Sequence, residues 1–333
     1  MDVRLDAVPM TRTGLHVSEI AFGTWRFARE TDRGRVEVGR ETAFDLLDTY
    51  AAAGGRFIDT ADVYGDGESE RWLGKWLSGR DRDEFVVASK VYFPTREGDP
   101  NASGLNRKHI RREVQYSLER LRTDYIDILY IHRWDDDTPA RELMRSLNAL
   151  VEEGKVHHLG ASTLAPNAWQ IARANGIAYR EGLEQFSITQ PRYNVVNREI
   201  EGEYMDFCRQ RGLDIAAWSP LAQGFLTGKY ERDGDLPEDA TASDTQGWDD
   251  RYLTEENFQA LDVVRDVAEE VGATPAQVAI AWQLEHPQVT APIVGARTVG
   301  QLEENLRAAT VDLSEAQFDR LADAKAGPFE NLL

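Results

Sequence analysis

Short apolar runs alternate with longer amphipathic stretches along the whole chain. The runs are rich in β-branched residues and each is followed by a helical pattern, which is typical of buried parallel strands joined by helices. Strands are predicted at 20–25, 57–61, 85–91, 126–132, 156–162, 183–190, 213–218 and 290–294. Helices are predicted at 40–53, 68–77, 107–121, 139–153, 166–174, 199–211, 255–271, 275–284 and 299–309.

Eight strands with crossover helices predict an α/β fold of the (β/α)8 TIM barrel type, because closure pairs both edge strands. Residues 8–17 are predicted to form a β-hairpin that caps one end, and 314–324 an extra C-terminal helix. We expect residues 1–333 to form a single domain, since no linker divides them. Segment 230–254 is acidic, rich in Gly and Pro, and aperiodic, which favours a lid over the barrel mouth; the alternative is a surface insertion.

The composition narrows the function. The 58 acidic residues exceed the 38 basic ones and give a net charge of -20, which argues against nucleic acid as a partner. No apolar stretch approaches the ~18 residues of a membrane span, and residues 1–6 show no leader pattern. Cys208 is the single cysteine, so no intrachain disulfide is possible. A cytoplasmic enzyme with no membrane partner is expected.

Lysine is scarce, since only six of the 38 basic residues are lysine. Excess carboxylate with few lysines predicts an acidic surface suited to high salt, as in a halophile. A GC-rich genome that favours Arg over Lys explains the composition equally well.

Three of the predicted strands end in a polar side chain. Asp59, Lys90 and His132 each follow an apolar run, and Tyr64 lies in the loop after Asp59. Because the carboxyl ends of barrel strands converge on one mouth, we expect these four side chains to meet there. The alternative is a buried Asp-Lys ion pair with the Tyr and the His as packing at the rim.

These residues can form a proton donor. A tyrosine normally keeps its proton until pH ~10. An ammonium about 4 Å from the phenolate contributes roughly 4 kcal/mol at an effective dielectric of 20. We therefore expect Lys90 to lower the pKa of Tyr64, while Asp59 keeps Lys90 charged and offsets part of that effect. His132 can bind the same substrate oxygen.

The motifs around these residues carry a family resemblance. Segments 57–65, 89–90 and 131–135 closely resemble the three signatures of the aldo-keto reductases. The likeness extends from 14–18 near the N-terminus to 303–306 near the end. It implies NADPH-dependent reduction of a small-molecule aldehyde or ketone, or the reverse oxidation, with the nicotinamide held without a Rossmann fold.

The resemblance also implies a role for each residue of the site. Tyr64 is the general acid, Asp59 and Lys90 tune it, and His132 orients the carbonyl. Ser162, Thr163 and Gln190 bind the carboxamide, and Trp218 stacks on the nicotinamide ring. The other cofactor contacts implied are Thr24, Trp25, Ser219, Pro220, Leu221, Gln223, Gly224, Lys229, Gly295, Ala296, Arg297, Gln301, Glu304 and Asn305.

The chain departs from the family at some cofactor positions. Thr163 stands where Asn is common, and Gly295 and Gln301 stand where some branches have Lys and Arg. Arg297 is then the one clear basic residue for a 2′-phosphate. We predict NADP(H), with NAD(H) as the alternative cofactor.

Aromatic residues at the strand ends and in the following loops predict a substrate pocket. The pocket residues expected are Trp25, Phe27, Tyr92, Phe93 and Trp134, with ordinary core packing as the alternative. No metal is predicted, because adjacent residues on a strand, such as His157 and His158, point to opposite faces.

One rival function is that of a Schiff-base aldolase barrel using Lys90, which needs a depressed lysine pKa. The other is a cofactor-sensing module like the β subunits of potassium channels. The sequence assigns no oligomeric state.

Overall fold

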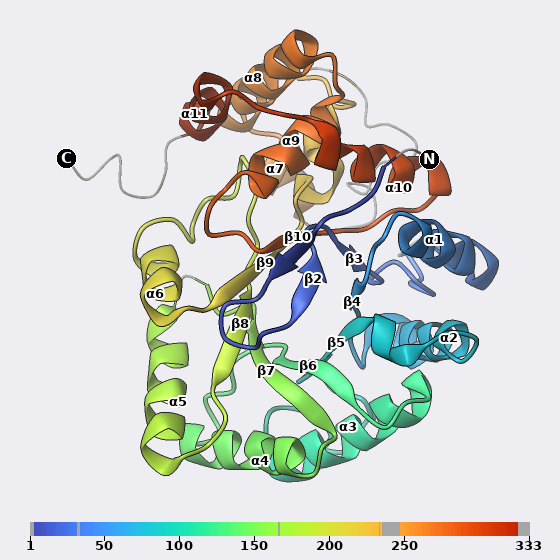
Figure 1. Ribbon diagram of the computed structural model, residues 1–333, viewed down its shortest axis with the longest axis vertical. Helices are drawn as coiled ribbons and strands as arrows, with labels where there is room; N and C mark the ends of the chain where they lie inside the picture. Colours follow the sequence, from blue (N-terminus) through green and yellow to red (C-terminus); the bar gives the residue numbers. More distant parts are fainter. Residues whose placement is uncertain (1–2, 32–33, 166, 233, 235–246, 326–333) are drawn as a thin grey trace.

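The computed structural model describes residues 3–31, 34–165, 167–232, 234 and 247–325. Eight parallel strands close into a barrel in the order β10-β3-β4-β5-β6-β7-β8-β9, with the helices outside it (Figure 1). The strands are β3 (Ala21–Gly23), β4 (Phe57–Asp59), β5 (Val86–Val91), β6 (Ile126–Ile131), β7 (Val156–Ser162), β8 (Phe186–Gln190), β9 (Asp214–Trp218) and β10 (Ala291–Val294). The predicted (β/α)8 barrel is confirmed.

Most helices lie where the periodicity predicts them. Their bounds are α1 (Arg40–Ala52), α2 (Glu68–Leu77), α3 (Arg107–Leu121), α4 (Ala140–Glu152), α5 (Ala168–Glu181), α6 (Glu203–Arg211), α7 (Trp248–Tyr252), α8 (Glu255–Val271), α9 (Pro275–Leu284), α10 (Val299–Leu306) and α11 (Glu315–Asp323). The predicted end of α5 at 174 is wrong. Ala178 is buried on the same face of the helix as Ile171 and Ala174. The helix therefore continues to Glu181 and ends at Gly182, whose φ is +67°.

A hairpin covers the amino-terminal end of the barrel, as predicted. Its strands are β1 (Ala7–Pro9) and β2 (His16–Ser18), which lie across the barrel in Figure 1. Met10 and Val17 pack into the apolar cluster inside the barrel. The backbone N–H of Thr11 donates to Asp214, the first residue of β9, at 3.0 Å. The carboxyl end of the barrel is therefore the open mouth.

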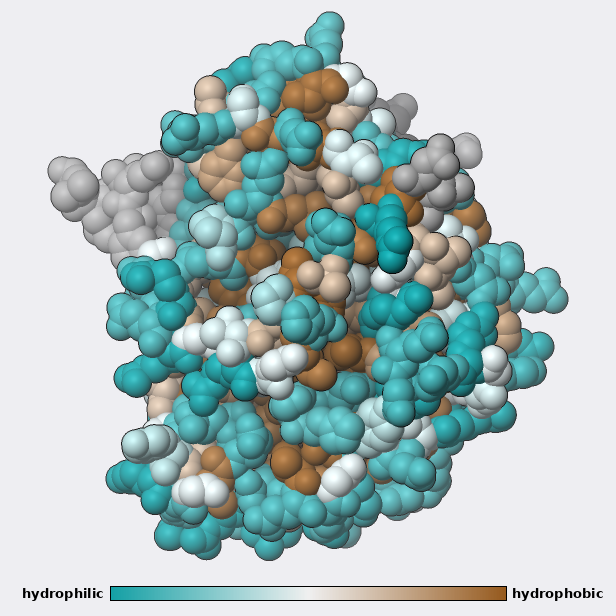
Figure 2. Space-filling view, in the orientation of Figure 1, coloured by the Kyte–Doolittle hydropathy of each residue, from teal (hydrophilic) through white to brown (hydrophobic). Residues whose placement is uncertain are grey.

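The apolar core has two parts. A small cluster fills the barrel interior, and a larger one lies between the strands and the surrounding helices. Hydrophilic residues cover most of the face shown in Figure 2, and the hydrophobic ones form small separate areas. Among the helices of the described residues, none has the length and hydropathy that crossing a membrane requires.

The predicted lid at 230–254 contains residues 233 and 235–246, which lie outside the described residues. The prediction of an aperiodic loop is wrong at α7. Trp248 and Tyr252 of this helix are fully buried and pack on Phe225, with ring centroids 6.4 and 6.1 Å away. Two aromatic side chains four residues apart share one face of a helix, which is why this short segment folds into the core.

Candidate active site

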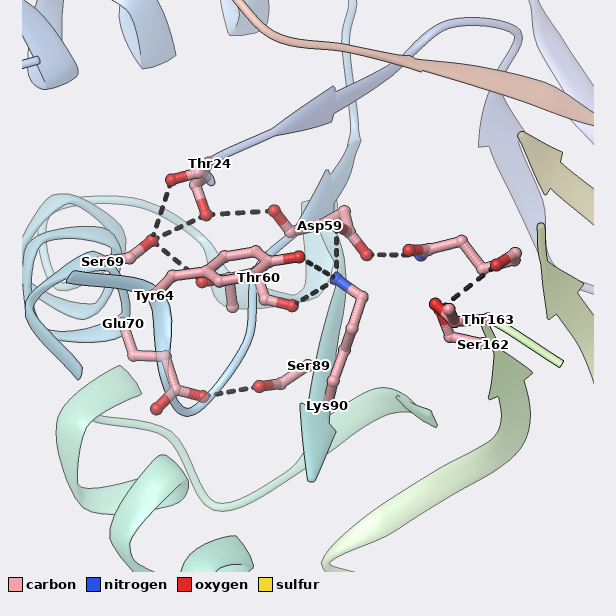
Figure 3. Close-up of polar contacts among 11 residues, drawn as sticks. Thr24, Asp59, Thr60, Tyr64, Ser69, Glu70, Ser89, Lys90, Ser162 and Thr163 are labelled. Atoms are coloured by element: carbon pink, nitrogen blue, oxygen red, sulfur yellow. Dashed lines mark hydrogen bonds and ion pairs between the residues drawn. The ribbon is translucent and has the colours of Figure 1, made fainter. Parts of the chain in front are cut away.

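The four predicted catalytic residues meet at the barrel mouth. Asp59 is the last residue of β4, Lys90 lies in β5, His132 directly follows β6, and Tyr64 begins the short helix after β4. The Nζ of Lys90 lies 2.6 Å from Oδ2 of Asp59 and 3.1 Å from the hydroxyl oxygen of Tyr64 (Figure 3). The carbonyl oxygen of Thr60 accepts a third hydrogen bond from the same ammonium at 2.8 Å.

Lys90 is a buried charge with all its donors used. The residue is 1% exposed, so the charge needs partners to remain in the interior. The other oxygen of Asp59 accepts from Nε2 of Gln190 at 2.7 Å, and its carbonyl oxygen accepts from Oγ1 of Thr24 at 3.0 Å. The carboxylate and the carbonyl oxygen of Asp59 are thereby both held in place, and Asp59 in turn orients the ammonium of Lys90 toward the phenol of Tyr64.

Buried polar side chains below the site lock the strand ends together. Glu70 of α2 accepts from Oγ of Ser89 at 2.6 Å and from Nε of Arg120 at 2.6 Å. Ser69 donates to Oγ1 of Thr24 at 2.7 Å (Figure 3). Since Ser89 directly precedes Lys90, these bonds set the position of the lysine. This group was not predicted from the sequence, although polar residues beside a buried strand were a signal for it.

The electrostatics of Tyr64 differ from the expectation. Burial raises the pKa of Tyr64 by more than the ammonium of Lys90 lowers it, and Asp59 raises it further, so the net pKa lies above its ordinary value. The predicted lowering is wrong, because it left out the cost of a buried phenolate. Burial lowers the pKa of Lys90, but Asp59 and Tyr64 together raise it above the ordinary value. The phenol and the ammonium both hold their protons at neutral pH.

His132 is a neutral imidazole beside the phenol. Burial, followed by the charge of Lys90, holds its pKa well below the ordinary value. Its ring meets the rings of Tyr64 and Phe93 edge-on, with centroids 5.9 and 4.9 Å away. A neutral imidazole has one N–H and can donate it to a carbonyl oxygen.

A cavity of about 930 Å³ opens above these residues. Asp59, Tyr64 and His132 lie in its wall, and Lys90 lies just beneath. Every cofactor residue expected from the family resemblance lines the cavity except Thr24 and Ala296, which are 0% and 4% exposed. Such a volume is at the upper end for a ligand pocket.

The predicted aromatic pocket is only partly present. Trp25 and Phe93 line the cavity. Phe27 does not, because the loop after β3 folds back and buries its ring in the core, 5.9 Å from the ring of Phe22. Tyr92 and Trp134 pack partly buried against the same core and lie outside the cavity wall.

The segments that the family resemblance predicts to bind the cofactor have several residues with positive φ. Thr163 has φ of +55°, a conformation that suits the Asn common in the family and is rare for a β-branched residue. Ser219 and Gln223 also have positive φ, at 61° and 56°. In the strap, the segment 219–229 that follows β9, four backbone N–H groups bond within the segment itself, namely those of Ala222, Gln223, Gly224 and Leu226. The cations of the wall, rather than these amides, are the groups that can meet a phosphate.

Three arginines of the cavity wall were not singled out by the sequence. They are Arg26, Arg29 and Arg133. The Nε of Arg26 lies 4.0 Å from the position that a Cβ on Gly295 would occupy. Glu37 accepts from Arg26 at 2.5 Å and from Arg29 at 2.6 Å. Only the folded loop after β3 brings Arg26 close to Gly295, so sequence spacing gave no signal.

Comparison with known proteins identifies the family of this chain. The model of the Aldo/keto reductase family matches residues 19–326. A norsolorinic acid reductase of Emericella nidulans is 37% identical over 317 residues, which cover 93% of this chain and 79% of that protein. An uncharacterized oxidoreductase of Bacillus subtilis is 34% identical over 326 residues, 95% of each chain. A probable voltage-gated potassium channel subunit beta of Oryza sativa subsp. japonica is 34% identical over 305 residues, 90% of each chain.

The chain belongs to the aldo/keto reductase family. Family membership and its oxidoreductase relatives assign it to the oxidoreductases that act on carbonyl compounds. Members of this family generally use a nicotinamide cofactor.

Proposed function

We propose that this protein reduces an aldehyde or ketone with NADPH and that Tyr64 supplies the proton. The observation that carries the proposal is the buried ammonium of Lys90 at 3.1 Å from the phenolic oxygen of Tyr64, a residue of the cavity wall. The bound nicotinamide supplies the hydride. A carbonyl carbon that receives a hydride leaves an oxygen that needs a proton, and a protonated phenol in the wall is a donor for it.

Each neighbour of Tyr64 has a distinct effect on the proton. Lys90 stabilises the phenolate that forms when Tyr64 gives up its proton, because the opposite charge lies within hydrogen-bond distance. Asp59 keeps the lysine charged and oriented from 2.6 Å. His132 is neutral and donates an N–H to the carbonyl oxygen, which places that oxygen near the phenol.

The cavity fits a dinucleotide. Trp218 presents an aromatic ring in the wall, and the indole Nε1 is buried without a hydrogen-bond partner among the described residues. Ser162 and Gln190 offer polar groups beside it, as carboxamide recognition requires. Lys229 and Arg297 supply cations farther along the wall. These residues would hold the nicotinamide, the pyrophosphate and the adenosine in that order.

The test of the proton donor is Tyr64→Phe. This variant should lose about 10²–10⁴-fold in turnover, the usual contribution of general acid catalysis. Its affinity for NADPH should stay near that of the wild type, because the lost hydroxyl serves the substrate. The decrease in NADPH absorbance with a nitrobenzaldehyde measures the turnover. A variant that retains more than a tenth of wild-type turnover removes Tyr64 from the role.

The preference for NADPH rests on cations at the adenosine end. Arg297 lines the cavity there, and Arg26 reaches the same end beside Gly295. A charge-assisted hydrogen bond to the 2′-phosphate contributes about 1.5–3 kcal/mol. Arg297→Ala should therefore weaken NADPH binding by roughly ten- to hundredfold and leave NADH binding almost unchanged. Dissociation constants from tryptophan quenching test this, and equal losses for both cofactors would contradict it.

The two rival functions are weaker. A Schiff-base lysine must be neutral to attack a carbonyl, whereas Lys90 has a raised pKa and is 1% exposed. The relatives named as channel β subunits keep a cofactor-sensing role open. Measurable steady-state turnover of NADPH distinguishes the enzyme from a sensor that binds cofactor and turns over little.

A further inference from the structure

The cavity carries the opposite charge to the chain. The whole chain has a net charge of -20. The cationic residues in the cavity wall are Arg26, Arg29, Arg133, Lys229 and Arg297, and the carboxylates there are Asp59 and Glu304. The charge of Asp59 is matched by Lys90 at 2.6 Å. A positive cavity in an acidic protein attracts anions and focuses them on the site.

Four of these five cations can be assigned either to the cofactor or to a partner within the protein. Lys229, Arg297 and Arg26 belong to the part of the wall that fits the phosphates of the cofactor. Arg29 is paired with Glu37 at 2.6 Å and stacks on the ring of Trp25, with the guanidinium 4.0 Å from the ring centroid. Arg133 is the remaining cation, and neither the cofactor nor a partner within the protein accounts for it.

Arg133 lies at the substrate end of the cavity. It directly follows His132, whose ring meets those of Tyr64 and Phe93. Arg133 is exposed and lines the cavity, and it forms no hydrogen bond or ion pair with any residue in the described part of the chain. No carboxylate of the described residues therefore competes with a ligand for the guanidinium of Arg133.

We propose that the substrate carries an oxyanion, a carboxylate or a phosphate, and that Arg133 binds it while the carbonyl oxygen lies between Tyr64 and His132. The guanidinium presents its N–H donors as a planar fork that matches either oxyanion. Trp25 and Phe93 provide apolar walls for the body of the substrate. This inference rests on the proposed function and narrows its substrate class.

The experiment compares three aldehydes that differ in charge. They are 4-formylbenzoate, its neutral methyl ester, and 4-formylphenyl phosphate, each measured with saturating NADPH at low ionic strength. We expect kcat/KM for at least one anion to exceed that of the ester by about tenfold, or 1.4 kcal/mol, mainly through KM. The larger of the two anion effects identifies the group as carboxylate or phosphate. Added KCl should shrink the preference, because Arg133 is exposed to solvent.

Variants test whether Arg133 is the cause. Arg133→Gln should bring the anion-to-ester ratio close to one, and Arg133→Glu should invert it. Arg173→Gln is the matched control, because Arg173 is an exposed arginine of α5 outside the cavity wall and has no ion pair among the described residues. It makes the same change in net charge and should keep the wild-type ratio. Equal ratios in wild type and Arg133→Gln, or a loss of NADPH affinity in Arg133→Gln, would overturn the inference.

A binding measurement separates this inference from the proposed function. Quenching of tryptophan fluorescence by 4-(hydroxymethyl)benzoate, compared with its methyl ester, reports the oxyanion site without any turnover. Absence of turnover with every carbonyl compound overturns the proposed function. Tighter binding of the acid that Arg133→Gln removes still supports the oxyanion site, and equal binding of acid and ester counts against it.

Discussion

Asp62 is a buried carboxyl group that the proposed chemistry does not use. It is 3% exposed, and neither oxygen accepts a hydrogen bond of normal geometry from a described residue. Burial raises the pKa of Asp62 well above its ordinary value, and the nearby carboxylates of Glu70 and Glu113 raise it further. The folded protein therefore holds a proton on Asp62 at pH values where the unfolded chain has lost it.

This proton predicts the pH dependence of stability. An unfolded aspartate ionises near pH ~4, so above that pH the folded state binds more protons and its free energy of unfolding falls as the pH rises to the folded pKa. Asp62→Asn removes the group. The variant should unfold at a higher temperature than the wild type at pH 8, by about 2 °C for each kcal/mol gained, with a smaller difference near pH 4. Thermal unfolding at both pH values measures this.

Asp66→Asn is the control for this prediction. Asp66 lies in the same loop but is exposed, and its φ of +55° is one that Asn tolerates. It makes the same Asp-to-Asn substitution at an exposed position, so it removes no buried acid. If both variants show the same pH dependence, general charge and not the burial of Asp62 is the cause.

At the residue scale, the positions of the proposed catalytic groups were predictable and their environments were not. Asp59, Lys90 and His132 could be placed together because strand ends converge in a barrel. The direction of the pKa shift of Tyr64 could not, because it depends on how deeply the phenol is buried. The prediction that Phe27 lines the substrate pocket was wrong for a related reason, because its loop folds the ring into the core.

At the element scale, α2 packs closely against the C-terminal end of α3 at Gly74. A Cβ placed on Gly74 would lie 2.3 Å from the carbonyl oxygen of Arg120 and 2.5 Å from the carbonyl carbon of Leu121. Both are backbone atoms, which can move aside only if one helix shifts against the other. This packing matters for the site, because α2 carries Glu70 and α3 carries its partner Arg120.

Gly74→Ala should therefore destabilise the protein, even though alanine favours helices. Overpacking costs about 1–3 kcal/mol or more where the surroundings cannot relax, which exceeds the gain of roughly 0.5–1 kcal/mol from replacing a helical glycine. Gly176→Ala is the matched control, because nothing lies within 4 Å of its added methyl group in the middle of α5. Urea unfolding should show a loss for the first variant and a gain for the second. A gain in both would mean that α2 and α3 separate at little cost.

The elements were predicted best where periodicity dominates. The bounds of α2, α3 and α8 agree with the amphipathic pattern, and those of α9 were predicted as well, because Pro275 marks its start. The short helix α7 escaped prediction because five residues contain too little periodicity. The strap after β9 takes its shape from residues with positive φ, such as Ser219, which no hydrophobic pattern reveals.

At the scale of the whole molecule, the charge of -20 predicts how stability responds to salt. Carboxylates that repel one another destabilise the compact state. Salt screens that repulsion at separations beyond the Debye length, which is about 10 Å at 0.1 M and shorter at higher salt. Salt also screens the surface ion pairs, but each of those contributes only about 0–1 kcal/mol. Because acids outnumber bases 58 to 38, the relief of repulsion should exceed the loss of ion pairs. The unfolding temperature should therefore rise with KCl at neutral pH.

The same scan near the isoelectric point separates the charge effect from other actions of salt. The sequence pI is about 4.8, so at pH 5 few uncompensated carboxylates remain to repel one another. If repulsion is the cause, the rise in unfolding temperature between low and molar KCl should be large at pH 7.5 and nearly absent at pH 5. An equal rise at both pH values would point to a general effect of salt on apolar burial. A flat dependence at pH 7.5 would favour a genome that prefers arginine over an adaptation to salt.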